Sequence, residues 1–296
     1  MVGAIVACAV GLQDPAGSPV EAPVRFLGSD EGVGVVADVG VWVPRLTGTA
    51  QVGAGGTQFD LNTQLAVGDD TAGVAGEFAV LSGRWRFGGL GFAVSESGTD
   101  GAPAAGTFGG VAIAAGDTIS GSYSAWMAGA EVGYTLWRPL ADEPWPWDGP
   151  GTNRAGATEA LGGNGRPLFD VQLLVLGGAL AFHYEQELTN VSAGGTGSFD
   201  RTIAAPYAGA GLDLRLGMDG RVPLVQDVRV YAMAGAGPSI PDAEIVWMVR
   251  VGIAAMIDPN VGVEFGYRLF DFDLSDGPSQ VDAGIRGIFG AVSIRF

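Results

Sequence analysis

Apolar and polar positions alternate along most of the chain from residue 32 onward. The clearest case is 245–257, where large apolar residues such as Ile245, Trp247 and Val251 take every second position. The turn residues Asp258-Pro259-Asn260 follow, and a second alternating run covers 260–272. A period of two is typical of β-strands, and two such runs joined by three turn residues predict a hairpin.

Ten segments share this alternation and are predicted as strands, to within a few residues at each end. They are 32–43, 73–82, 84–96, 120–137, 168–187, 204–216, 226–236, 245–257, 260–272 and 280–296. Short turns such as 82–84 and 258–260 alternate with long connections over 44–72, 97–119 and 188–203. Short periplasmic turns and long external loops are typical of bacterial membrane barrels. The segment 138–167 departs from this rule as a long insertion on the periplasmic side.

The two faces of these strands have different characters. One face is large and apolar over its whole length, whereas the other mixes Gly and Ala with single charges. A lipid-facing surface outside and small or polar residues inside are typical of a membrane barrel. The pattern therefore predicts an all-β fold, a transmembrane antiparallel up-and-down β-barrel of ten strands. Eight or twelve strands, and a soluble secreted β-sandwich, are the alternatives.

Two predicted strands change phase at a pair of glycines. Large apolar residues switch from odd to even positions across Gly88-Gly89 and again across Gly177-Gly178. A β-bulge adds one residue to a strand and would restore a single apolar face. We therefore predict a bulge at each pair, with Phe182 and Tyr184 facing lipid beyond the second one.

Composition supports a membrane barrel and excludes several other classes. The chain has 296 residues, a formal net charge of -17, only 16% charged residues and 51 Gly, and its mean hydropathy is +0.29. All 15 basic residues are Arg and form no clusters, which excludes a nucleic-acid binder. One Cys permits neither a disulfide nor a Cys-based zinc site. No apolar run reaches the roughly 20 residues of a membrane helix. We expect no cofactor.

The N-terminal region predicts export. Residues 1–12 are apolar and small, and we interpret them as a secretory leader whose beginning is missing; an unstructured stub is the alternative. Residues 13–31, which contain three prolines, are predicted as an N-terminal tail. The barrel would then occupy 32–296 with 138–167 inserted.

The C-terminus carries a resemblance. Ile288, Val292, Ile294 and Phe296 alternate with small and polar residues on the last predicted strand. An alternating last strand that ends in Phe resembles the signature of bacterial outer-membrane β-barrel proteins. The resemblance implies localisation in the bacterial outer membrane, contact with its lipid, and an assembly signal at Phe296 that the barrel-assembly machinery engages.

Charges on the strand bodies would face the lumen if the apolar face meets lipid. Six acids and six arginines do so, and their pairing is expected because an unpaired charge in a confined interior costs several kcal/mol. We predict an ion-pair network formed by Asp38, Glu77, Glu131, Glu185, Asp213 and Glu264 with Arg84, Arg86, Arg215, Arg229, Arg250 and Arg268. Scattered exposed pairs are the alternative interpretation.

The only histidine is the candidate for an enzymatic role. With the predicted bulge, His183 would face the lumen together with Ala181 and Glu185, which permits a general base oriented by a carboxylate. The omptin proteases, also ten-stranded barrels, look similar, but they pair their His with an Asp two positions earlier, where this chain has Ala181. Loop acids such as Asp70, Asp273 and Asp276 could bind Ca²⁺ but lack EF-hand spacing, and we expect no metal site.

The sequence thus predicts a monomeric outer-membrane barrel with a structural or surface role. A barrel of about ten strands has an interior that side chains can fill, so a wide pore is excluded while a small one is not. The alternative is a barrel-embedded hydrolase, a protease or lipid-acting enzyme, that uses His183.

Overall fold

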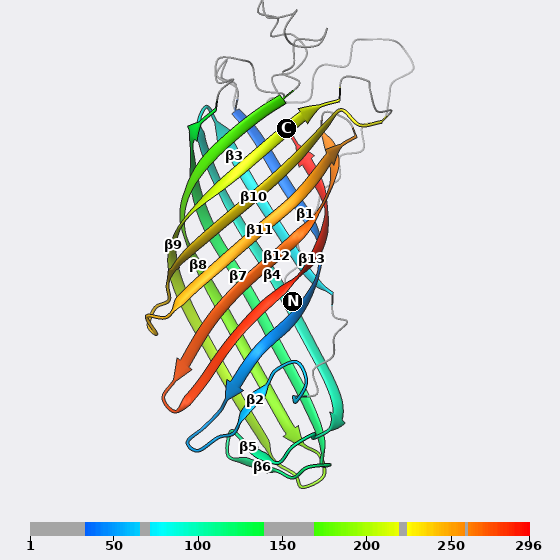
Figure 1. Ribbon diagram of the computed structural model, residues 1–296, viewed down its shortest axis with the longest axis vertical. Helices are drawn as coiled ribbons and strands as arrows, with labels where there is room; N and C mark the ends of the chain where they lie inside the picture. The colour runs from blue at the N-terminus through cyan, green and yellow to red at the C-terminus, as the bar shows by residue number, and fades with distance from the viewer. Residues whose placement is uncertain (1–32, 66–71, 139–168, 219–223, 258–259) are drawn as a thin grey trace, which may run out of the picture.

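The computed structural model describes residues 33–65, 72–138, 169–218, 224–257 and 260–296. Within these ranges the chain forms long antiparallel strands that close into a barrel (Figure 1). The barrel strands are β1 (Val33–Gln51), β3 (Gly73–Ser82), β4 (Trp85–Gly101), β7 (Thr118–Trp137), β8 (Phe169–Asn190), β9 (Thr196–Gly217), β10 (Asp227–Pro238), β11 (Ile245–Met256), β12 (Val261–Asp276) and β13 (Ser279–Arg295).

Each barrel strand pairs with its neighbours in chain order, and β13 pairs with β1 to close the ring. The closing pair runs without interruption from Val36 opposite Arg295 to Gln51 opposite Gln280. The predicted antiparallel barrel of ten strands is therefore confirmed. Among the described residues, no helix is both long and apolar enough to cross a membrane.

The two ends of the barrel differ. The last residue pairs with the start of β1, because the N–H groups of Val35 and Phe296 each donate to the other's carbonyl. This end also holds the short β3–β4 and β11–β12 connections and is the periplasmic end. The opposite end carries β2 (Gln58–Asp60), β5 (Gly106–Phe108) and β6 (Val111–Ile113). Figure 1 shows that β4, β7, β8 and β9 extend furthest toward this external end.

The strands continue into segments predicted as external loops. β1 extends to Gln51, β4 to Gly101, and β9 begins at Thr196. Strands tilted in a bilayer need about 9–11 residues to cross it, whereas β8 and β9 have 22 residues each. About half of each long strand therefore stands outside the membrane. The alternation is less regular there, which explains the misplaced ends.

The predicted bulges at the glycine pairs are wrong. Strand register runs unbroken through Gly88-Gly89 and through Gly177-Gly178 on both sides. In the described pairings of β7 with β8, the register shifts instead between Thr135 and Trp137. The leader at 1–12, the tail at 13–31 and the insertion at 139–167 lie outside the described residues.

Candidate functional site

The apolar side chains lie on the outer surface in one half of the barrel and in the lumen in the other half. In the periplasmic half, the outward side chains are apolar and exposed, and the lumen holds charges. In the external half, the lumen holds apolar and aromatic side chains, and the outward positions are polar. On β8, for example, Leu173 and Val175 point outward in the periplasmic half, whereas Glu185 and Glu187 point outward in the external half. The barrel is thus a membrane barrel in one half and resembles a soluble barrel in the other.

A charged cluster around Arg250 occupies the middle of the periplasmic half. The two terminal nitrogens of Arg250 lie 2.6 Å from Glu77 Oε2 and 2.8 Å from Glu131 Oε2. Arg268 lies 3.5 Å from the other oxygen of Glu77, and Arg86 approaches both carboxylates at 3.8 Å. These side chains come from β3, β4, β7, β11 and β12, so the contacts cross the lumen from wall to wall.

Phenol groups also donate hydrogen bonds to carboxylates in the periplasmic half. Tyr207 donates to Glu131 Oε2 at 3.0 Å, and Tyr231 donates to Glu264 Oε1 at 2.6 Å. Both rings are buried. Buried carboxylates need such donors because their desolvation is costly. The sequence signal for Tyr231 was its position two residues after Arg229, on the same face.

A second charged cluster lies nearer the periplasmic mouth. Asp213 accepts from Arg229 Nε at 2.7 Å and from Arg215 Nε at 3.2 Å. Beside it, Arg295 reaches Asp227 at 3.3 Å. Arg295 alternates with Ile294 and Phe296 on the last strand, but the predicted network did not include it. Asp227 is the first residue of β10 and stands outside a long alternating run.

The structure brings ten of the twelve predicted network residues to the lumen. Asp38, one of these ten, is buried opposite Ser293 on the closing strand. Two residues lie elsewhere. Arg84 is exposed in the β3–β4 turn, and Glu185 is exposed on the outer surface of β8 because the predicted bulge is absent. Removing this pair leaves five acids and five arginines, so the charges of the predicted set still balance.

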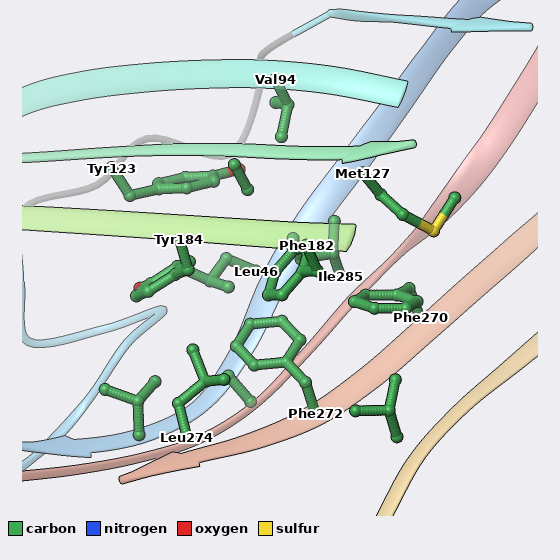
Figure 2. Packing of buried hydrophobic residues seen from close by; sticks show 14 of the residues in the cluster. Leu46, Val94, Tyr123, Met127, Phe182, Tyr184, Phe270, Phe272, Leu274 and Ile285 are labelled. Atoms are coloured by element: carbon green, nitrogen blue, oxygen red, sulfur yellow. The ribbon is translucent and has the colours of Figure 1, made fainter. Parts of the chain in front are cut away.

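Aromatic side chains fill the external half of the lumen (Figure 2). The Phe182 ring lies 4.7 Å from Phe270 and 4.6 Å from Phe272, between centroids, and Trp42 packs edge-on against Phe92 at 4.8 Å. Trp42 is 1% exposed, and Phe182 and Phe272 are 0% exposed. Such T-shaped and tilted pairs add stability beyond the apolar area that they bury. The prediction that Phe182 and Tyr184 face lipid is therefore wrong.

His183 lies on the outer surface, contrary to the prediction that it faces the lumen. Its ring stacks on Trp126 at 5.8 Å, and its Nδ1 lies 3.0 Å from Thr202 Oγ1 and 3.6 Å from Asp200 Oδ1. Trp126 is 41% exposed. Trp is enriched where a membrane meets water, so this pair marks the external edge of the apolar belt.

The external connections pack onto the aromatic core and cover the mouth. Phe59 in β2, Leu61 just after it and Phe108 in β5 are buried in the same apolar cluster as Trp42. Gly109 N–H donates to the Val52 carbonyl at 3.0 Å, which ties the two connections together. The described part of these connections therefore packs over the external end of the lumen.

A carboxylate anchors this covering segment to β8. Asp117 Oδ2 accepts from Ala114 N–H at 2.9 Å and from Asn190 Nδ2 at 2.8 Å. These hydrogen bonds, led by that of Ala114, lower the pKa of Asp117. Across the described residues, no three His, Cys, Asp or Glu side chains are grouped to hold a metal ion.

Comparison with known proteins gives matches at the level of structure only. No family model matches the chain, and neither does any curated protein. The outer-membrane protease OmpT of Escherichia coli is 10% identical, covers 92% of this chain and 99% of its own, and has a TM-score of 0.48. The translocator domain of the autotransporter NalP from Neisseria meningitidis is 13% identical, with coverages of 90% and 89% and a TM-score of 0.32.

The transport unit of the autotransporter AIDA-I from E. coli gives 9% identity, coverages of 92% and 94% and a TM-score of 0.34. These values give no ground for assigning an activity. The chain's own closed ring of ten antiparallel strands, with an outward apolar belt on its periplasmic half, has the architecture of outer-membrane proteins. The protein is a β-barrel of the bacterial outer membrane.

Proposed function

We propose that the protein is a sealed outer-membrane barrel with a structural and surface role, and that its lumen does not conduct. The observation that carries the proposal is the double filling of the lumen. The charged clusters around Arg250 and Asp213 fill the periplasmic half, and the aromatic core fills the external half. An ion crossing the barrel would have to disrupt both.

The external half supports the surface role. Its long strands and covering connections project beyond the belt, and their outward positions are polar. These include Ser95, Ser97, Thr99, Ser120, Ser122, Ser124, Glu185, Glu187, Asp200 and Asp282. A rigid interior holds this polar surface in fixed geometry, which is what a surface-exposed scaffold requires. The exposed Phe296, paired with Val35, would offer the assembly signal, and we propose a monomer.

Planar-bilayer recording of the purified full-length protein tests the sealed lumen. We expect no conductance steps. Folding is verified by heat-modifiable gel mobility. The two layers permit a sharper test, because Phe182→Ala with Phe272→Ala truncates the aromatic layer, and Arg250→Ala with Glu77→Ala and Glu131→Ala truncates the charged layer. Each folded variant should remain closed, since the remaining layer seals the lumen. Steady conductance steps in the unmodified protein would overturn the proposal.

A hydrolase that uses His183 has less support, because the ring stands on the outer surface beside Trp126. The contact of its Nδ1 with Thr202 and Asp200 is nevertheless an arrangement that can be tested. Protease or lipase activity that His183→Ala abolishes, and that Asp200→Asn weakens, would replace the structural role by an enzymatic one.

A further inference from the structure

A small pocket opens at the periplasmic mouth of the barrel, away from the aromatic core. It is formed by the β3–β4 turn and by β7, β8 and β9. Its lining residues are Leu81, Gly83, Arg84, Trp85, Arg86, Thr135, Gln172, Leu174, Asp213 and Arg215. Arg84 stands exposed at the rim, whereas Gln172 and Thr135 are buried in the wall. The pocket is thus open to solvent and polar at its base.

The charge of this lining is unusual for an acidic chain. The protein has 15 Arg in 296 residues and a net charge of -17, yet three Arg and one acid line this single pocket. The one acid, Asp213, already has both oxygens in contact with Arg215 and Arg229. Positive charge therefore exceeds negative charge within the pocket.

Arg86 has only long contacts with carboxylates. Its nitrogens lie 3.8 Å from Glu77 and from Glu131, beyond hydrogen-bond distance, while both carboxylates make shorter contacts with Arg250. Within the described part of the chain, the buried Arg86 Nε has no hydrogen-bond partner. Because nearly all buried N–H groups in proteins are hydrogen-bonded, this N–H is a candidate donor to a bound anion.

We propose that this pocket binds a small oxyanion, a phosphate or carboxylate group, between Arg84 and Arg86. Guanidinium groups suit such anions because their planar N–H pairs match two oxygens at once. The small size of the pocket favours a single oxyanion group over an extended molecule. This group could belong to a free ion or to the headgroup of an anionic lipid in the inner leaflet.

Calorimetric titration with inorganic phosphate tests the site, using the full-length protein in a phosphate-free zwitterionic detergent at constant ionic strength, since salt screens charges. We expect saturable binding that Arg84→Ala weakens by about tenfold, as loss of one charge-assisted contact should. Arg84 is exposed, so this variant should fold. Arg45→Ala is the matched control, because Arg45 is also exposed, on β1 and outside the lining, and it should leave the affinity unchanged.

Nanodiscs distinguish the two sources of the anion. Phosphate binding that persists in both phosphatidylcholine and phosphatidylglycerol discs identifies a free ion as the ligand. Binding that is lost only in phosphatidylglycerol discs identifies the lipid headgroup. Absence of phosphate binding in detergent, or equal weakening by Arg84→Ala and Arg45→Ala, would overturn the proposal without affecting the sealed lumen.

Discussion

Arg250 is the side chain through which the largest charged cluster is held together. It contacts Glu77 and Glu131 at once, so replacing it with Met would leave two buried carboxylates without their closest cation. Breaking a buried ion pair by removing one partner costs about 3–5 kcal/mol. We therefore expect Arg250→Met to lower the free energy of unfolding by that amount, measured by urea titration of the protein in lipid vesicles.

The double variant Arg250→Met, Glu131→Gln separates charge from packing. It removes one cation and one carboxylate together, while Glu77 keeps Arg86 and Arg268 as neighbouring cations, so we expect it to recover part of the loss. Arg45→Met, at an exposed site, should change stability by less than about 1 kcal/mol. A single variant as stable as the unmodified protein would mean that the cluster contributes shape alone.

Adjacent glycines on β8 offer a matched pair of substitutions at the scale of the strand. A Cβ at Gly178 would lie 2.3 Å from the Ala130 carbonyl oxygen and 2.8 Å from the Tyr207 ring, whereas one at Gly177 meets nothing closer than 3.9 Å. We expect Gly178→Ala to destabilise the barrel by roughly 1–3 kcal/mol through overpacking. Gly177→Ala should change it by less than about 1 kcal/mol. Equal unfolding midpoints would contradict this assignment of faces.

The same glycine pair shows where sequence reasoning failed. Alternation predicted all ten strands and ten of the twelve lumen charges, because a period of two reports which residues share a face. The period does not report which face contacts water. The face that contacts water changes at the point where a strand leaves the membrane. Phe182 and Tyr184 were assigned to lipid through a bulge, although the unbroken strand turns them into the core. The glycine at 178 is there because the Tyr207 ring lies over it.

The anchoring of the external covering segment should depend on pH. The pKa of Asp117 is lowered in the folded state, so its contribution to stability is present above the unfolded pKa of about 4 and is lost as the pH falls through the lower, folded value. We expect hydrogen-exchange protection of the Ala114 amide to fall over that acidic range, after correction for intrinsic exchange. In Asp117→Asn the protection should be weaker at neutral pH and should no longer follow this titration.

For the whole molecule, the exchange of faces fixes the depth at which the barrel sits in the membrane. Outward positions are apolar up to the level of Trp126 on β7 and polar beyond it, where Ser124 and Ser122 follow on the same face. On the periplasmic side of that level, the apolar outer surface contacts lipid. On the external side, the polar outer surface contacts water, and the lumen supplies an apolar core as in a soluble barrel. The same alternation of apolar and polar residues therefore fits lipid in one half of the barrel and water in the other.

Quenching of tryptophan fluorescence by brominated lipids tests this placement. Trp126 is 41% exposed at the proposed edge, whereas Trp42 is 1% exposed inside the lumen. Bromines near the headgroup should quench Trp126 more strongly than bromines near the chain ends. Trp126→Phe should therefore remove part of the shallow quenching, and Trp42→Phe should remove none, because the barrel wall separates that ring from lipid. If Trp126→Phe instead removed mainly deep quenching, the belt would extend further outward, and Glu185 and Glu187 would have to lie in lipid. The cost of placing two carboxylates there is the physical reason to expect the shallow result.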